Sequence, residues 1–540
     1  MRTGSPGRLS MTQTKAARRD FADSRTATDA EAVTPPPPPR ENSGRERGGD
    51  VTLGWKGRQF VPGEGDRTDE RGGVASVPRG AIAVEETVTG ADAAAPVVRL
   101  IRGDALGVAR GLAADGLRGK VDLVYVDPPY ASDRSWALEA RLDGPADGRV
   151  RRHVAYDDKL DPSAYLEMLA PRLGALTELL SPTATIWVHL DWRSAYLVRV
   201  VLDEILGREA FLNEIVWRRA PNLGRQATSQ QFGRTLDTIL VYGARPARGR
   251  GRNGRGTDAV LIPPTRLEPI EEASIRWDGD PAKGGRPFTT APRGDYTDAS
   301  IERLEAEGRV HRTPTGKVYI KYFLVRDASG AWCRERRVDA LWTDVPPLRH
   351  AAVGERTGFP TQKPRALLDR IIACATKPGG LVVDLFAGSG TTGEAAHALG
   401  RRAILGDAGD AGIATARARL VRFGASVSVE RLGDAAPTTG GEVEIVSERV
   451  DLLHVRVRLV RPKEPLAWAI DPELVPGRPF HARWHSERVP GVRPVPVASE
   501  AIVLCPAPGV ASRIAVRVFT DEGAIVTRVL GAPGEPHESS

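Results

Sequence analysis

The sequence predicts an α/β protein with a doubly wound, mostly parallel sheet, an inserted region in the middle of the chain and a β-rich C-terminal region. Short β-branched runs such as VDLVYV (121–126) alternate with amphipathic stretches such as RALLDRIIACAT (365–376). The alternation stops over residues 244–349, which are rich in Gly, Arg and Pro, and then resumes. From about residue 426 the chain carries short strand-like runs without helical patterns between them.

The elements follow from the apolar period and from turn residues, taken in chain order. Continuous apolar runs predict strands that are buried on both faces, and stretches with a helical apolar period predict the helices that cover them. Pro171 is expected to interrupt one helical stretch because an internal proline removes a hydrogen bond. The expected strands are 97–101, 121–126, 184–190, 211–217, 238–242, 317–325, 381–386 and 401–407, and the expected helices are 105–117, 163–180, 194–206, 365–376, 391–400 and 411–423.

Composition bounds the class of protein. The chain has 540 residues, of which 41% are hydrophobic and 27% charged, which is ordinary for a globular protein of several domains. No stretch of about 18 uninterrupted apolar residues occurs, and the first residues lack the apolar core of a secretory signal. We therefore expect a protein of the cytoplasm that neither spans nor binds a membrane.

Charge and cysteine content add two further expectations. The formal net charge is +7, which favours a polyanionic partner, although an even excess of surface charge is a common alternative. The three cysteines lie far apart and form no Cys-x-x-Cys pair. Neither a disulfide framework nor a metal site is expected.

Composition also sets the expected boundaries of the regions. Residues 1–92 have almost no apolar period and contain five consecutive prolines, so we expect a disordered tail, with order beginning near Val97. The regions that follow are an α/β half over 93–243, an insert over 244–349, a second α/β half over 350–425 and a β-rich region over 426–540.

A glycine-rich turn follows the strand that ends at Asp384. The segment DLFAGSGTTG places Gly388, Gly390 and Gly393 between a strand and a helix, where the backbone can approach a nucleotide closely. Asp407 closes the next strand and is a candidate acceptor for ribose hydroxyls. The turn suits either a dinucleotide or S-adenosylmethionine, and glycines that serve only tight strand-to-helix packing are the simpler alternative.

The strand at 121–126 ends in Asp-Pro-Pro-Tyr. The carboxylate of Asp127 and the carbonyl oxygen of Pro128 form a pair of hydrogen-bond acceptors, and Tyr130 offers an aromatic face beside them. Such a loop suits a flat base with an exocyclic amine, because two acceptors can hold both amine hydrogens. An ordinary turn at the end of a strand is the alternative. Dehydrogenase chemistry has no use for this loop.

Three motifs together resemble one family. Asp-Pro-Pro-Tyr at 127–130, Thr-Gln-Lys-Pro at 361–364 and Asp-Leu-Phe-Ala-Gly-Ser-Gly-Thr-Thr at 384–392 are similar to the motifs of the site-specific DNA amino-methyltransferases, the N6-adenine and N4-cytosine enzymes. The order of the two halves, with an insert between them, resembles the permuted beta subgroup, in which the target-recognition region lies in the middle. The resemblance covers about 97–425 and implies the fold of the S-adenosylmethionine-dependent methyltransferases.

The resemblance also implies roles for matching residues. The base-holding, catalytic loop would consist of Asp127, Pro128, Pro129 and Tyr130. Asp407 would meet the ribose, although Leu-Gly-Asp differs here from the family's more usual Gly-Ile-Asp or Gly-Ile-Glu. The residues implied for cofactor binding are Asp104, Lys363, Pro364, Asp384, Phe386, Gly388, Gly390, Thr391 and Asp407. The implied cofactor is S-adenosyl-L-methionine, and no metal is needed.

The implied function is methyl transfer to the amine of a flipped base in double-stranded DNA. An Asp at position 127 resembles the N6-adenine enzymes most, with the N4-cytosine enzymes as the first alternative. An RNA methyltransferase, a nicotinamide oxidoreductase and a noncatalytic DNA-binding homologue are further alternatives. A restriction nuclease and a second copy of the chain are candidate partners besides DNA.

Other residues are candidates for DNA contact or for the core. The segment between residues 217 and 256 contains nine arginines and one acidic residue, Asp237, which is an excess of 9 − 1 = 8 positive charges. This segment predicts a DNA contact, with a solvated basic loop as the alternative. His189 has no Ser, Cys or Asp at a suggestive spacing and is expected to pack. Three tryptophans are expected in the core or its shell, with base stacking as the minority interpretation: Trp187, Trp192 and Trp217.

Overall fold

A computed structural model gives the fold of the chain. The structure describes Gly54, Arg58 and residues 81–530, except for residues 93, 131–134, 142–149, 222–229, 245–260, 263, 434–441, 452, 463–464, 476, 489–496, 505–512 and 521–524. Most of the expected tail and six of the nine arginines of the segment 217–256 therefore lie outside the described residues. Cys505 does so as well.

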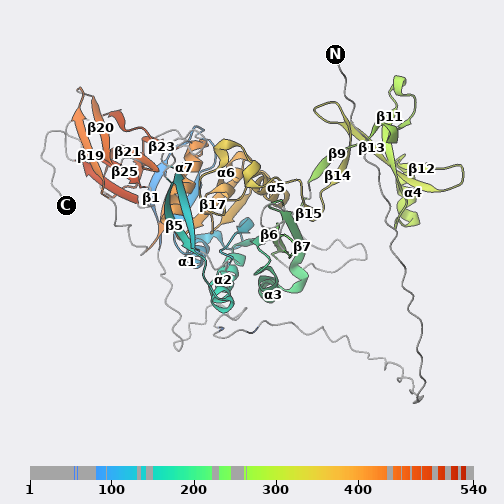
Figure 1. The fold of residues 1–540 in the computed structure, drawn as a ribbon, viewed down its shortest axis with the longest axis horizontal. Helices are drawn as coiled ribbons and strands as arrows, with labels where there is room; N and C mark the ends of the chain where they lie inside the picture. Colours follow the sequence, from blue (N-terminus) through green and yellow to red (C-terminus); the bar gives the residue numbers. More distant parts are fainter. Residues whose placement is uncertain are drawn as a thin grey trace, which may run out of the picture. The chain divides into compact units, whose positions relative to one another are not determined.

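A large sheet forms the centre of the fold (Figure 1). It has eleven strands in the order β15-β7-β8-β6-β3-β16-β17-β2-β18-β1-β22. Its middle strands, from β6 to β18, each run parallel to the next one along the sheet. β8 is antiparallel to both β6 and β7, and β1 is antiparallel to β18. The prediction of a mostly parallel α/β sheet is thus confirmed. The strands are β1 (Ile82–Val88), β2 (Val98–Arg102), β3 (Val121–Val126), β6 (Leu180–Leu190), β7 (Phe211–Arg218), β8 (Leu236–Gly243), β15 (Leu341–Trp342), β16 (Leu381–Asp384), β17 (Arg402–Asp407), β18 (Val427–Leu432) and β22 (Phe480–Ala482).

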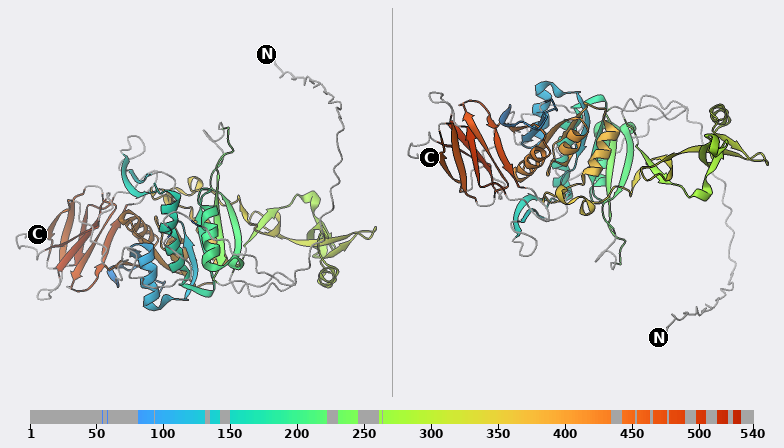
Figure 2. Two further views of the ribbon diagram at one scale, coloured as in Figure 1. Left: turned by 90° about the horizontal axis from the view of Figure 1, so that it is seen from below. Right: turned by 90° about the horizontal axis from the view of Figure 1, so that it is seen from above.

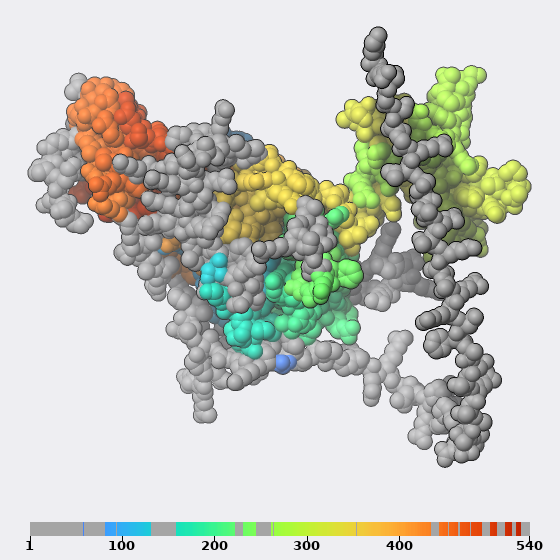
Figure 3. Space-filling model, viewed as in Figure 1, coloured from blue at the N-terminus to red at the C-terminus, as the bar shows by residue number. Residues whose placement is uncertain are grey.

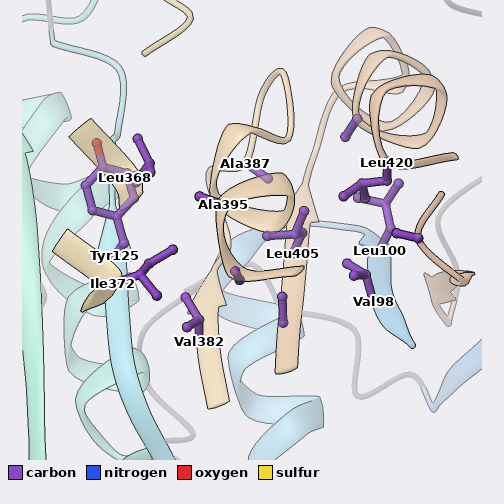
Figure 4. Packing of buried hydrophobic residues seen from close by; sticks show 14 of the residues in the cluster. Val98, Leu100, Tyr125, Leu368, Ile372, Val382, Ala387, Ala395, Leu405 and Leu420 are labelled. Atoms are coloured by element: carbon purple, nitrogen blue, oxygen red, sulfur yellow. The ribbon is translucent and has the colours of Figure 1, made fainter. Parts of the chain in front are cut away.

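Helices cover both faces of this sheet (Figure 2). Successive strand residues point to opposite faces: in β3, Leu123 and Tyr125 join one apolar cluster, and Val124 and Val126 join the other. Figure 4 shows part of the first cluster, where side chains of β2, β3, β16 and β17 meet helix residues such as Leu368. Burial on both faces explains why these strands read as continuous apolar runs. One face is covered by α1 (Ala105–Leu112), α2 (Pro162–Thr177) and α3 (Ala195–Leu206), and the other by α5 (Arg365–Ala375), α6 (Thr391–Ala398) and α7 (Asp410–Arg422).

The two sequence halves form one sheet through β3 and β16. Val382 and Val383 of β16 pair in parallel with β3. The carboxylate of Asp122, in β3, accepts a hydrogen bond of 2.8 Å from the backbone amide of Leu381. In the space-filling view the yellow surface of the second half adjoins the teal and green surface of the first (Figure 3). The pairing aligns the carboxyl ends of strands that are far apart in sequence.

The expected interruption at Pro171 is wrong. α2 runs without a break from Pro162 to Thr177 with Pro171 inside it. The helix buries Leu166, Leu169, Leu173 and other residues against the sheet. Tertiary packing of this apolar face outweighs the loss of one backbone hydrogen bond.

The insert contains its own sheet. Six antiparallel strands form it, and Ile301 and Leu304 of α4 (Asp298–Ala306) pack against Ile320. The expected insert nevertheless ends too late, because β15 pairs in parallel with β7 and belongs to the central sheet. The strands of the insert are β9 (Thr265–Pro269), β10 (Arg276–Asp278), β11 (Arg286–Pro292), β12 (Val310–Arg312), β13 (Val318–Arg326) and β14 (Trp332–Arg337), and a separate pair outside it consists of β4 (Ser135–Arg141) and β5 (Val150–Asp157).

The C-terminal region is β-rich, as predicted, and forms two small sheets. Its expected start at 426 is wrong by one strand, since β18 pairs with β2 inside the central sheet. The expected tail is also too long, because β1 pairs with β18 and β22. One sheet is β19 (Glu444–Arg449), β20 (His454–Arg461) and β24 (Glu500–Leu504), and the other is β23 (Trp484–Glu487), β21 (Ala467–Leu474), β25 (Arg513–Phe519) and β26 (Ile525–Leu530).

No helix in the described ranges has the length and apolar composition that crossing a bilayer requires.

A buried ion cluster joins β1, α7 and the C-terminal strands. Glu86 and Arg417 are both fully buried and pair at 2.6 Å. Arg417 also pairs with Glu487 at 2.7 Å, and Arg517 approaches Glu86 at 3.3 Å. Burial alone would raise the pKa of Glu86, but the charges of Arg417 and Arg517 hold it below its usual value. The ion cluster therefore connects β1 and α7 to the C-terminal region of the chain.

We predict that Glu86→Ala lowers the free energy of unfolding by about 3–5 kcal/mol, because it leaves buried arginine charge without its partner. The control is Glu178→Ala, which breaks the exposed Arg118–Glu178 pair and should cost about 1 kcal/mol or less. Urea unfolding of both variants measures the difference. Equal losses in the two variants would contradict this account of the cluster.

Candidate active site

The Asp-Pro-Pro-Tyr loop begins where β3 ends. β3 stops at Val126, and the two prolines that follow Asp127 cannot donate to a strand ladder. Because β3, β6, β16 and β17 are parallel, the residues after each strand share one edge of the sheet. In open α/β sheets ligands bind at this carboxyl edge.

A cavity of about 310 Å³ opens at this edge. Most of the residues that the sequence singled out line it, although Pro364 and Gly390 do not. The structure thus brings together the Asp-Pro-Pro-Tyr loop, the glycine-rich turn and the end of β17. The singled-out residues at the cavity are Asp104, Asp127, Pro128, Pro129, Tyr130, Lys363, Asp384, Phe386, Gly388, Thr391 and Asp407.

Asp127 is held from two sides. The hydroxyl of Tyr130 donates a hydrogen bond of 2.6 Å to Oδ1, and Nζ of Lys363 donates one of 2.5 Å to Oδ2. Burial and the charge of Asp127 raise the pKa of Tyr130 well above its ordinary value, so its hydroxyl remains a donor. Each carboxylate oxygen has a second lone pair, so the carboxylate can still accept from a ligand.

Lys363 contacts the loop of the first half rather than only its own half. The sequence assigned it to the cofactor, but its ammonium group pairs with Asp127 and lies 5.2 Å from the centre of the Tyr130 ring. Thr361, two residues earlier, has a φ of 59°, which is rare for a residue other than glycine. Backbone strain of this kind gathers at functional sites. The Thr-Gln-Lys-Pro segment therefore lines the cavity beside the Asp-Pro-Pro-Tyr loop.

Asp384 is a buried carboxyl at the start of the glycine-rich turn. Its oxygens accept from the hydroxyl of Thr392 at 2.5 Å and from the amide of Phe386 at 3.0 Å. Burial raises the pKa of Asp384 to about 7, and the nearby charges of Asp127 and Asp407 act in the same direction. The side chain fixes the shape of the turn while it borders the cavity.

Asp407 closes β17 beside the turn. Its oxygens accept from the backbone amides of Gly388 at 2.9 Å and Gly409 at 2.7 Å. Burial raises the pKa of Asp407, although these two hydrogen bonds counteract it. A Cβ on Gly412 would lie 2.6 Å from Cγ of Asp407. The carboxylate therefore needs a glycine on the facing helix α7.

The two glycines of the turn have different surroundings. Both have positive φ, 48° at Gly388 and 75° at Gly390. A Cβ on Gly388 would lie 2.9 Å from the ring of Phe359, which lines the cavity. A Cβ on Gly390 would instead lie 2.8 Å from Cβ of Ala416, on α7. Gly388 shapes the cavity, whereas Gly390 permits close helix packing, which was the simpler alternative for these glycines.

Thr391 belongs to the glycine-rich turn, and Pro364 belongs to the Thr-Gln-Lys-Pro segment. The hydroxyl of Thr391 donates a hydrogen bond of 3.2 Å to the carbonyl oxygen of Lys363 and accepts one of 3.0 Å from the buried Arg419. Pro364 precedes the first turn of α5 and stands at its N-cap. Arg419 also pairs with the buried Glu394. These contacts fix where Lys363 stands relative to the turn.

Asp104 lies at the start of α1. Its carboxylate caps the helix by accepting a hydrogen bond of 2.9 Å from the amide of Leu106. It also forms an ion pair with Arg172, which lines the cavity from α2. The sequence did not single out Arg172. The signal in the sequence was a cation within the mostly apolar helical stretch 163–180.

The prediction for His189, at the end of β6, was incomplete. Its Nδ1 lies 2.9 Å from the hydroxyl of Tyr125, and its Nε2 lies 3.2 Å from Oδ2 of Asp237. The ring stacks beside Tyr130 with centroids 6.3 Å apart. His189 is thus buried beside the Asp-Pro-Pro-Tyr loop in a polar network. Its Asp partner comes from β8, 48 residues later, which no local spacing reveals.

The expected tryptophans divide into two groups. Trp187 and Trp217 are buried in the core, as expected. Trp192 was expected in the core or its shell, but it is 47% exposed and therefore lies outside the core. It follows β6 directly and therefore stands at the carboxyl edge.

Of the nine arginines in the basic segment, the described ones are Arg218, Arg219 and Arg234, and none of the three is buried. Arg218 and Arg219 lie at the C-terminal end of β7, and Arg234 lies just before the start of β8. Among the residues that the structure describes, no group of three or more His, Cys, Asp or Glu side chains is placed to hold a metal ion.

Residues 121–416 match the family model described as DNA methylase, of the N6/N4 type. This match spans more than half of the 540 residues. The chain belongs to this DNA methylase family. Membership identifies S-adenosylmethionine as the cofactor, and the expectation from the sequence motifs is confirmed at this level.

Individual relatives agree with the family. The chain is 31% identical over 297 residues to the Type II methyltransferase M.EcaI of Enterobacter cloacae, a match that covers 53% of this chain and 61% of the relative. It is 28% identical over 336 residues to the Type III restriction-modification enzyme StyLTI Mod subunit of Salmonella typhimurium, covering 55% and 49%. The chain thus spans about half to three fifths of the length of these relatives.

A solved structure described as a putative DNA modification methylase from Thermus thermophilus, complexed with S-adenosyl-L-methionine, is 17% identical. The match covers 62% of this chain and 99% of that one, with a TM-score of 0.33. The family assignment rests on the match of the family model.

The cavity residues suit S-adenosylmethionine. Asp104 and Asp407 offer carboxylate oxygens for amine and hydroxyl donors, and Phe359 and Phe386 offer apolar surface. Gly388 lets the backbone of the turn approach a ligand closely. Together the lining residues offer the polar and apolar groups that a nucleoside with a charged tail requires.

We predict that Asp384→Asn reduces the pH dependence of stability. A carboxyl with a pKa of about 7 in the folded protein and an ordinary pKa of 3.8 in the unfolded chain binds more protons when folded, so the folded state loses stability as the pH rises from about 4 to about 7. The loss approaches about 4 kcal/mol for three pKa units. Asn cannot titrate. The free energy of unfolding of the variant, measured with urea, should therefore increase relative to that of the wild type as the pH rises across this window. A difference that is constant with pH would contradict the assignment.

Proposed function

We propose that this protein is a site-specific DNA methyltransferase that transfers a methyl group to the exocyclic amine of a flipped base, with adenine N6 as the acceptor. The observation that carries the proposal is Asp127, a carboxylate that Tyr130 and Lys363 hold in the lining of a cavity of about 310 Å³. The order of the two halves supports the permuted beta subgroup. Residues 244–349 are proposed to recognise the target sequence, and Asp407 and Asp104 to hold the ribose and adenine of the cofactor.

The proposed mechanism is direct displacement. S-adenosylmethionine, when bound, supplies an electrophilic methyl group. Asp127 and the carbonyl oxygen of Pro128 accept hydrogen bonds from the amine of the base and orient its lone pair. As the nitrogen gains the methyl group and a neutral thioether is released, positive charge develops on the nitrogen. The carboxylate of Asp127 would stabilise that charge until the nitrogen releases a proton to solvent. Tyr130 stacks on the base and offsets part of the unstacking cost.

Lys363 has a positioning role in this scheme. Its ammonium group keeps the carboxylate of Asp127 in one orientation at 2.5 Å. The buried network of Tyr125, His189 and Asp237 supports the loop from behind. Preorganised groups of this kind need little rearrangement during the reaction.

Cytosine N4 is the first alternative acceptor, because the family includes both chemistries. RNA as the substrate and a noncatalytic DNA-binding role are further alternatives. The similarity to a Type III Mod subunit supports a restriction nuclease as a partner. We further propose the cytoplasm as the site of action.

We predict that Asp127→Ala abolishes methyl transfer to unmodified duplex DNA, with a loss of at least about 100-fold, because a preorganised charge-stabilising group is removed. Transfer of labelled methyl groups to DNA measures the activity, and the same assay with RNA tests the RNA alternative. Cofactor affinity, measured by equilibrium dialysis, should remain near that of the wild type. Retained turnover in the variant would exclude this mechanism.

A further inference from the structure

Trp192 stands apart from the other aromatic residues of the central sheet. It is 47% exposed although it lies between a buried strand, β6, and the start of helix α3. The guanidinium of Arg234 covers its ring at 3.9 Å from the ring centroid, and that of Arg193 lies at 5.0 Å. An exposed indole that arginines hold in place is a stacking surface rather than a core residue.

This surface is at the same edge of the sheet as the base-holding loop. β6 and β3 are parallel neighbours, with Val188 opposite Val126, so both chains leave the sheet on one side. β8 is antiparallel to β6 and begins at this edge, which places Arg234 there. A chain of contacts connects the two places. It runs from Tyr130 to His189, Asp237, Arg219 and the backbone of Arg234.

The charges around Trp192 suit nucleic acid. The acidic residues nearest to it in these elements, Asp191 and Asp237, are buried and already paired with arginines. Arg218, Arg219 and Arg234 are not buried. An aromatic ring beside arginines that outnumber the neighbouring acidic residues matches the combination that binds unpaired bases together with their backbone.

We propose that Trp192, supported by Arg234, stacks on a nucleobase of the DNA segment that opens when the target base is extruded. The proposal rests on the proposed function, since it requires a DNA substrate. Extrusion leaves neighbouring bases without a stacking partner, and an indole at the rim of the site replaces part of that lost stacking. Trp192 thereby lowers the free energy that base extrusion requires.

The test compares two DNA probes that share one strand and differ only in two nucleotides of the other strand. One is a fully paired oligonucleotide duplex, and the other carries a two-nucleotide unpaired bubble. Fluorescence anisotropy gives the dissociation constant of the full-length protein for each probe. We expect the wild type to prefer the bubble. Trp192→Ala should lose about 5- to 150-fold in affinity for the bubble, the range for one base–aromatic stack, and little for the paired duplex.

Three further variants make the test specific. Trp192→Phe retains a ring and should keep most of the bubble preference. Trp192→Leu retains apolar volume without a ring and should lose it, which covers a failure of the alanine variant to fold. The matched control is Phe423→Ala. Phe423 is 41% exposed with Arg422 at 5.3 Å, but it precedes β18 at the opposite edge of the sheet.

An unchanged bubble preference in Trp192→Leu and Trp192→Ala would overturn the proposal. An equal loss on both probes would overturn it as well, because that result indicates general weakening of DNA contact. Methyl transfer by the wild type is measured separately. If the wild type methylates DNA while the bubble preference does not depend on Trp192, this inference alone fails; if it methylates no DNA, the proposed function fails.

Discussion

The ion pair between Lys363 and Asp127 joins two parts of the chain that are 236 residues apart. It can form only because β3 and β16 are parallel neighbours, which brings the loop after β3 to the edge of the sheet where the second half builds the glycine-rich turn. Thr391 then anchors the backbone of Lys363 to that turn. One interaction therefore couples the side of the cavity that would hold a base to the side that would hold the cofactor.

Buried carboxylates determine which ligands suit this edge of the sheet, and their burial lowers the stability of the fold. Burying an ion without compensation is strongly unfavourable. Asp407 is compensated by two backbone amides, and Asp384 by one amide and one hydroxyl. The pKa of both is nevertheless raised, because burial outweighs these hydrogen bonds. The cavity is thus a place where several acidic groups are held close together, which favours ligands that carry amines and hydroxyls.

The sequence predicted the features that are local. Apolar runs located seven strands of the central sheet, and two carboxylates at their ends, Asp127 and Asp384, proved to face one cavity. These strands are β2, β3, β6, β7, β8, β16 and β17. Features that depend on distant pairing were missed. His189 meets Asp237 only because β8 folds back beside β6, and β1 could not be recognised as a strand because its partners β18 and β22 lie at the far end of the chain. Exposure of Trp192 likewise depends on where β6 ends.

The central claim is that a carboxylate-containing loop directs methyl transfer to an exocyclic amine in DNA. The most direct test is the identity of the modified nucleoside. Unmodified plasmid DNA is incubated with the purified protein and S-adenosylmethionine, digested to nucleosides and separated by mass spectrometry. The account predicts N6-methyladenine, placed at one recurring sequence when the same DNA is sequenced with detection of modified bases. Methylation at a ring carbon, or no methylation by a protein that binds the cofactor and DNA, would contradict it.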